Sequence, residues 1–240
     1  MNWQNVATIA RKDITIMMSR RGLRISIVTV PLAIAVGFAQ IVRLGNYPAD
    51  LLPRTLNAFL FFFIMYTGAL PASLASYSMV GEKIERSLEP LLATPATDGE
   101  ILLGKGIAAL VPPLAAMWAG MVLLMVQCDL FTRGTLGGLY FPNATAALTV
   151  LGVAPLVATM GVAFAVLMSA RVSEVRTAQQ LAALVALPWL GVYICTLSGV
   201  FVLDTVALCV MCGVLAVVDV SLAFAARATF GRETILTRWA

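Results

Sequence analysis

Few side chains in this 240-residue sequence are suited to acid–base, nucleophilic or metal chemistry. The chain contains no histidine, which removes the commonest general base, proton shuttle and metal ligand. Gly104-Lys105 lacks both the preceding glycine spacing and the following Ser or Thr of a phosphate-binding loop. Cys209 and Cys212 form a CxxC pair inside an apolar stretch, where packing on a helix face is a simpler interpretation than metal binding. We therefore expect no catalytic residues, no metal and no cofactor bound by this chain.

The composition indicates an integral membrane protein. Hydrophobic residues make up 60% of the chain and charged residues 12%, whereas soluble domains carry about 25% charged residues. A helical bundle in lipid can use this much apolar surface, because the lipid is itself an apolar solvent. The net charge of +4 follows from where the basic residues lie along the chain, and we expect no nucleic-acid partner.

Six apolar segments are long enough to cross a bilayer, which requires about 20 predominantly apolar residues. We predict one all-α domain over residues 1–240 with spans at 23–42, 55–80, 101–127, 144–170, 178–198 and 203–226. Residues 3–20 precede the spans and are too polar to cross. Their apolar residues recur at helical spacing, which predicts an amphipathic helix in the headgroup region or, alternatively, an ordinary helix in the cytosol. The stripe is Trp3, Val6, Ala10, Ile14 and Met17.

The connections between the spans predict an orientation. Thirteen of the sixteen Lys and Arg residues fall on one side of the predicted bundle, and only Arg43, Arg54 and Arg133 fall on the other. Connections rich in Lys and Arg stay in the cytosol, so we expect both termini to be cytosolic. The protein would then lie in the plasma (inner) membrane with short outer loops, the third of them around residues 199–204.

A polar stretch connects the second and third spans, with the sequence GEKIERSLEPLLATPATDGEILLGK at 81–105. It contains residues that typically cap or end helices. Ser87 is suited to cap a helix and Pro90 to its first turn. Pro95 ends that helix, and Thr97 with Glu100 has the spacing of a capping box for the third span. We predict a short helix at 87–93 with its leucines on one face. Those leucines either pack on the protein's own spans or in lipid, or bind a groove on a partner.

This stretch resembles the signature cytosolic segment of the ABC-2 type transporter permeases, notably the small six-span subunits encoded apart from their ATPase. The elements Glu-Lys, Ser-Leu-Glu, Leu-Leu-x-Thr-Pro and Ile-Leu-x-Gly-Lys stand in order. Many relatives have Gly-Thr where this chain has Arg86-Ser87, which keeps the hydroxyl. The stretches ARVSEVRTAQQLAALVALP and FGRETILTRW are also similar to family patterns, so the resemblance covers nearly the whole length.

The resemblance implies a transport subunit and not an enzyme. The segment at 87–93 would be a coupling helix that inserts into a separate ABC ATPase subunit, which binds ATP and Mg²⁺, and residues 3–20 would match the family's interfacial helix. A second permease copy or a close relative completes the expected complex, in contact with membrane lipids. The expected ATPase-coupling residues are Glu82, Lys83, Arg86, Ser87, Leu88, Glu89, Leu91 and Leu92. The family usually has re-entrant helices before the last span, so here either these are absent or residues 192–202 are re-entrant, with a break near Pro188 and Gly191.

Two polar residues within or at the end of spans are candidates for lining a translocation path. Asp219 lies inside the sixth span, and intramembrane carboxylates face the protein interior or water; alternatively it lies near the headgroups and pairs with Arg227 or a neighbouring helix. Gln127 and Asp129 are expected to cap the outer end of the third span. Two other functions stay open at this point: a membrane channel or scaffold with no motor, and an ABC importer permease.

Overall fold

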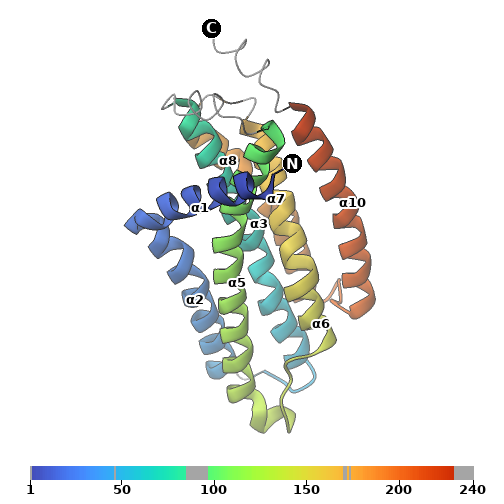
Figure 1. Ribbon diagram of the computed structural model, residues 1–240. Helices are drawn as coiled ribbons and strands as arrows, with labels where there is room; N and C mark the ends of the chain where they lie inside the picture. Colours follow the sequence, from blue (N-terminus) through green and yellow to red (C-terminus); the bar gives the residue numbers. More distant parts are fainter. Residues whose placement is uncertain (1, 46, 85–96, 170–171, 173, 230–240) are drawn as a thin grey trace.

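The computed structural model describes residues 2–45, 47–84, 97–169, 172 and 174–229. Every regular element within these ranges is a helix, and Figure 1 shows the long ones running side by side. In chain order they are α1 (Trp3–Ser19), α2 (Arg21–Leu44), α3 (Leu52–Ile84), α5 (Asp98–Leu136), α6 (Ala144–Leu148), a π-helical turn η1 (Thr149–Val153), α7 (Ala154–Ser169), α8 (Val175–Ala183), α9 (Ala186–Ser198) and α10 (Thr205–Thr229).

Six helical segments are long and apolar enough to cross a membrane. They are Arg21–Leu44, Leu52–Gly81, Asp98–Leu136, Ala144–Ser169, Val175–Ser198 and Thr205–Ala226. The predicted all-helical class and the number and order of spans are therefore confirmed. Apart from the end of the third span, each predicted boundary lies within about three residues of the observed one, which is the usual accuracy of such boundaries.

The predicted end of the third span at residue 127 is wrong. Helix α5 continues to Leu136 and ends at Gly137, whose φ of 72° is left-handed and therefore suits glycine. Asp129 does not face water at a helix end. Its carboxylate is buried and accepts the backbone N–H groups of Tyr140 and Phe141, each at 3.0 Å. The chain after Gly137 thus turns back along the last turns of α5, and neither Gln127 nor Asp129 caps that helix.

The predicted fifth span is interrupted near its middle. Pro188 has no N–H to donate to the carbonyl of Leu184, so a regular helix cannot continue through this point. The backbone there instead forms hydrogen bonds between residues three apart, from Leu184 N to Leu181 O and from Val185 N to Ala182 O, both at 3.2 Å. Helix α9 then continues to Ser198 and is followed by the turn at 199–204, with no further helix among these described residues.

Helix α3 is the centre of the bundle. In its most apolar stretch 67% of the residues are buried, against 11% in α10, and α5, α7, α8 and α9 all pack on it. Phe61 and Phe63 are fully buried on it. The contact with α7 is a close approach of two glycines, because a Cβ at Gly161 would lie 2.4 Å from the carbonyl oxygen of Gly68.

Helix α1 crosses the bundle near the end where α3 finishes and α5 begins (Figure 1); we call this the α3–α5 end. It packs on α5 and, less extensively, on α2. Val6, Ala10 and Met17 of the predicted stripe are buried, whereas Trp3 is 66% exposed. A Cβ at Gly104 of α5 would lie 2.8 Å from the Ile9 side chain, so the two helices touch at a position that only glycine allows.

Candidate functional site

The predicted ATPase-coupling residues lie at the edge of the described chain or beyond it. Glu82 and Lys83 fall in the last turn of α3. The other six, and with them the short helix predicted at 87–93, lie outside the described residues and stay a prediction: Arg86, Ser87, Leu88, Glu89, Leu91 and Leu92. What the structure does give is the frame from which this segment emerges, formed by α1, α3 and α5.

The first turn of α5 is held by the predicted capping box. The hydroxyl of Thr97 accepts the backbone N–H of Glu100 at 3.3 Å, and the Glu100 carboxylate accepts the backbone N–H of Thr97 at 3.1 Å. Two of the N–H groups that a helix start leaves unpaired are satisfied in this way. The chain therefore enters a rigid helix at Asp98, within the stretch 81–105 that carries the family resemblance.

Glu100 also holds the start of α1. Its carboxylate accepts the backbone N–H of Asn2 at 2.5 Å and the side-chain amide of Asn5 at 3.0 Å. One buried carboxylate thus fixes the first turns of two helices that are 95 or more residues apart in sequence. The capping box could be predicted from spacing, but the link to α1 could not, because nothing local in the sequence pairs Glu100 with Asn2 and Asn5.

A buried ion pair joins α1 to α5 further inside the α3–α5 end. The Nζ atom of Lys105 lies 3.2 Å from Oδ2 of Asp13, with side-chain exposures of 1% and 7%. The hydroxyl of Ser78 on α3 lies 3.2 Å from Nζ and 3.4 Å from the same carboxylate oxygen. Buried charges need such a partner and further hydrogen bonds to be tolerated. We call Asp13, Ser78 and Lys105 the polar triad; it ties together the three helices around the predicted coupling segment.

Sequence reasoning missed the triad, although it left a signal. Asp13 interrupts the apolar stripe of α1 between Ala10 and Met17, and Lys105 stands inside an otherwise apolar run. A carboxylate and an ammonium, each on an apolar helix face, indicate a pair. Lys105 is one of the thirteen basic residues on the side predicted to be cytosolic, and the structure buries it in the third turn of α5.

The two residues predicted to line a translocation path are not brought together. Asp219 of α10 lies against α7, where the Thr159 hydroxyl donates to its Oδ2 at 2.7 Å. Gln127 is on α5, 17 residues beyond Leu110, which lines the same pocket as Thr159, and this corresponds to about 26 Å along a helix. Oε1 of Gln127 is buried and has no hydrogen-bond partner among the described residues. Asp219 therefore contacts a neighbouring helix, and the roles of Asp219 and Gln127 in a translocation path stay predictions.

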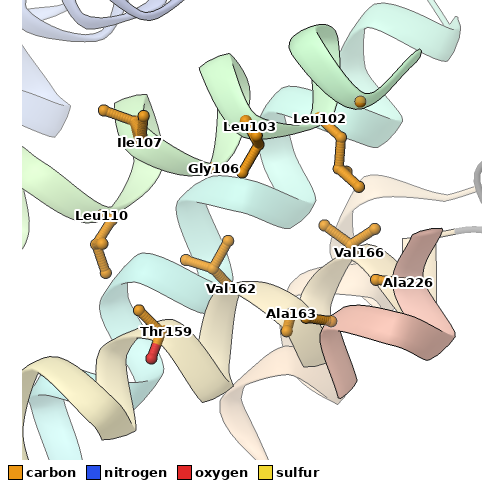
Figure 2. Close-up of a pocket in the computed structure, with 12 residues that line it drawn as sticks. Leu102, Leu103, Gly106, Ile107, Leu110, Thr159, Val162, Ala163, Val166 and Ala226 are labelled. Carbon is orange, nitrogen blue, oxygen red and sulfur yellow. The ribbon is translucent and has the colours of Figure 1, made fainter. Parts of the chain in front are cut away.

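A pocket of about 350 Å³ opens beside Asp219, between α5, α7 and α10. Figure 2 shows leucines and Ile107 of α5 on one side, Val162 and Val166 of α7 facing them, and Ala226 of α10 at one edge. Thr159, the residue that donates to Asp219, lies on its wall. Every other lining residue is apolar or glycine, and we call this space the α5–α7–α10 pocket.

No protein-family model matches this chain, and no curated protein matches it. The geometry of the α3–α5 end and the resemblance of residues 81–105 are therefore the basis for the function proposed below.

Proposed function

We propose that this chain is the membrane permease subunit of an ABC-2 type exporter, with ATP hydrolysis carried out by a separate subunit. The observation that carries the proposal is the position of the segment that resembles the family. It connects α3 to α5, two of the six apolar helices, at an end where the polar triad and Glu100 fasten α1 to the same frame. A force applied to such a segment would act on three helices at once.

In this proposal the leucines of the short helix at 87–93 bind a groove on the ATPase subunit. That partner binds ATP and Mg²⁺, and closure of its dimer moves the helix. The motion passes to α3 through Glu82 and Lys83 and to α5 through its capped first turn. Helix α1 follows, because Asp13 and Glu100 leave it no independent movement without breaking buried polar contacts. Two permease copies, or one copy and a close relative, would release the substrate between them.

The proposal includes an orientation. The α3–α5 end faces the cytosol and the opposite end, with the α5–α6 and α9–α10 turns, faces outward in the plasma (inner) membrane. Helix α1 would then lie at the cytosolic headgroup level with Arg11 and Lys12 exposed. This agrees with basic residues gathering on the cytosolic side, and with the attraction of such residues to anionic lipids.

Co-purification of the permease with its ATPase tests the proposal. We expect the tagged full-length chain, extracted from its native membrane in mild detergent, to carry an ATP-hydrolysing subunit with a phosphate-binding loop. Leu88→Asp and Leu91→Asp should each reduce the bound ATPase activity about tenfold or more, because a charge on the apolar face would have to be buried in the groove.

Leu139→Asp is the matched control. Leu139 is 69% exposed and follows α5 at the opposite end of the bundle, so this change should leave the bound ATPase activity intact. An ATPase that stays bound to both leucine variants would contradict the coupling assignment. A chain that carries no ATPase at all would favour a channel or scaffold with no motor.

A further inference from the structure

The carboxylate of Asp219 has an unsatisfied oxygen next to the α5–α7–α10 pocket. Its Oδ2 accepts from Thr159 at 2.7 Å, while its Oδ1 is buried with no hydrogen-bond partner among the described residues. Asp219, Ala223 and Ala226 recur at i, i+4 and i+7 and so share one face of α10, and the last two line the pocket. The carboxylate therefore lies one helical turn beyond the pocket wall, beside Thr159.

Among the side chains that the structure describes, none that lines the pocket supplies a positive charge to this carboxylate. None of the twelve lining residues is charged. Lys105 has neighbours in sequence that line the pocket, but its ammonium is directed to Asp13 on α1. A carboxylate within a membrane span is costly without a counter-charge, so a cation bound here would stabilise its ionised form.

The shape and chemistry of the pocket restrict that cation. A volume of about 350 Å³ falls in the range of pockets that hold small organic molecules. Calcium takes six to eight oxygen ligands, whereas the described residues of this site offer one carboxylate and one hydroxyl. A neutral acyl chain would fill the apolar part and leave the carboxylate unpaired. A molecule with an apolar body and one positive charge satisfies both parts.

We propose that the α5–α7–α10 pocket binds a hydrophobic monovalent organic cation, such as an amine or a quaternary ammonium ion. Its charged group pairs with Asp219, and its apolar body lies along Leu103, Ile107 and Val162 (Figure 2). That this ligand is exported rests on the proposed function, whereas its binding does not require the ATPase.

Equilibrium binding to the full-length chain without any ATPase tests the site. The chain is placed in nanodiscs of zwitterionic phosphatidylcholine, and binding of tritiated decyltrimethylammonium is measured against empty nanodiscs. We expect saturable binding that decyltrimethylammonium itself displaces. The neutral isostere, in which carbon replaces nitrogen, should displace it at least about tenfold less well, because it cannot pair with the carboxylate.

Variants separate recognition of charge from loss of folding. Asp219→Asn keeps the shape of the side chain and should weaken binding about tenfold or more, whereas Asp50→Asn, at an exposed position in the turn before α3, should not change it. Ala163→Phe narrows the pocket from α7 and should also weaken binding. Each variant is compared by its thermal unfolding midpoint.

Three results would overturn the proposal: no saturable binding to the unsubstituted chain, equal displacement by the neutral isostere, or unchanged binding to Asp219→Asn. Binding that depends on Asp219 in a chain that never associates with an ATPase would support the site and contradict the exporter. The reverse pattern, an ATPase partner without cation binding, would support the exporter and contradict the site.

Discussion

Lys105 and Asp13 show how two charges can be buried inside an apolar helical bundle. The two side chains lie 3.2 Å apart and are 1% and 7% exposed, so water contributes little to the solvation of either. Ser78 adds a hydroxyl to both charges. In such a pair the attraction largely offsets the loss of hydration, and the larger cost comes from removing only one partner.

Lys105→Met should therefore destabilise the protein by about 3–5 kcal/mol, because it leaves the Asp13 carboxylate buried and unpaired. The double variant Asp13→Leu with Lys105→Met should recover most of that loss, since both charges are then absent. Reversible unfolding in mild detergent, followed by far-ultraviolet circular dichroism, measures both values.

Lys12→Met is the matched control, because Lys12 is the exposed neighbour of Asp13 on α1 and its change should cost little. If Lys105→Met were as stable as Lys12→Met, the pair would not contribute to stability. If the double variant were as unstable as the single one, the loss would come from packing and not from an unpaired charge.

The sequence contained the two members of this pair but not their pairing. Asp13 and Lys105 are 92 residues apart, and the sequence alone does not show which face of α5 meets α1. By contrast, the capping box of Thr97 and Glu100 involves residues three apart, so their spacing was enough. Side-chain contacts were therefore predictable only where the two residues are close together in the sequence.

The contact between α3 and α7 shows how small residues decide the packing of helices in this bundle. Small residues let two backbones approach closely in a membrane, where the hydrophobic effect does not drive helices together. Here Gly68 and Gly161 meet, and a Cβ at Gly161 would lie 2.4 Å from a backbone oxygen. The close packing of α7 on the central helix α3 therefore requires glycine at position 161.

Gly161→Val should destabilise the bundle by about 1–3 kcal/mol or more, because the added atoms can be accommodated only by moving α7 away from α3. Gly213→Val on α10 is the control, since a Cβ there has nothing within 4 Å. The thermal unfolding midpoints of both variants in the same detergent check this. Equal midpoints would mean that α7 moves without cost.

Helix positions were predictable because they depend on runs of about 20 apolar residues, and helix ends were less so. The end of α5 was misplaced because Asp129 was read as a residue in water, whereas the returning chain satisfies its carboxylate with two N–H groups. The interruption between α8 and α9 follows directly from Pro188, one of the two residues that predicted a break in this segment.

The two ends of the molecule differ in basic charge, because thirteen of the sixteen Lys and Arg residues are predicted to lie at one of them. This asymmetry predicts the orientation of the protein in the membrane. Helix α1 and the connection of α3 to α5 lie at one end, and the turns after α5 and α9 lie at the other. With the α3–α5 end in the cytosol, the predicted coupling segment and both termini share the compartment of an ATPase. The coupling residues themselves could be proposed only from resemblance, because a docking surface is defined by its partner.

Thiol labelling in intact cells tests this orientation. In a variant without the four native cysteines, Thr135→Cys at the exposed end of α5 should react with a membrane-impermeant maleimide. Thr8→Cys, exposed on α1, should react only after the cells are opened. Labelling in the opposite order would reverse the orientation and contradict an ATPase at the α3–α5 end.

The distance in sequence between Asp13 and Lys105 has a consequence for biosynthesis. Asp13 is made 92 residues before Lys105, so α1 leaves the ribosome with an apolar face that has nowhere to pack and a carboxylate that must stay hydrated. Lys105 then enters the bilayer with α5, where an unpaired ammonium is unfavourable. Lys105 is therefore in an unfavourable solvent until Asp13 pairs with it, and the apolar face of α1 is exposed to water until α5 has been made. The docking of α1 is in this sense a late assembly step that completes the insertion of the third span, and a chain that lost its first twenty residues would have to insert Lys105 unaided.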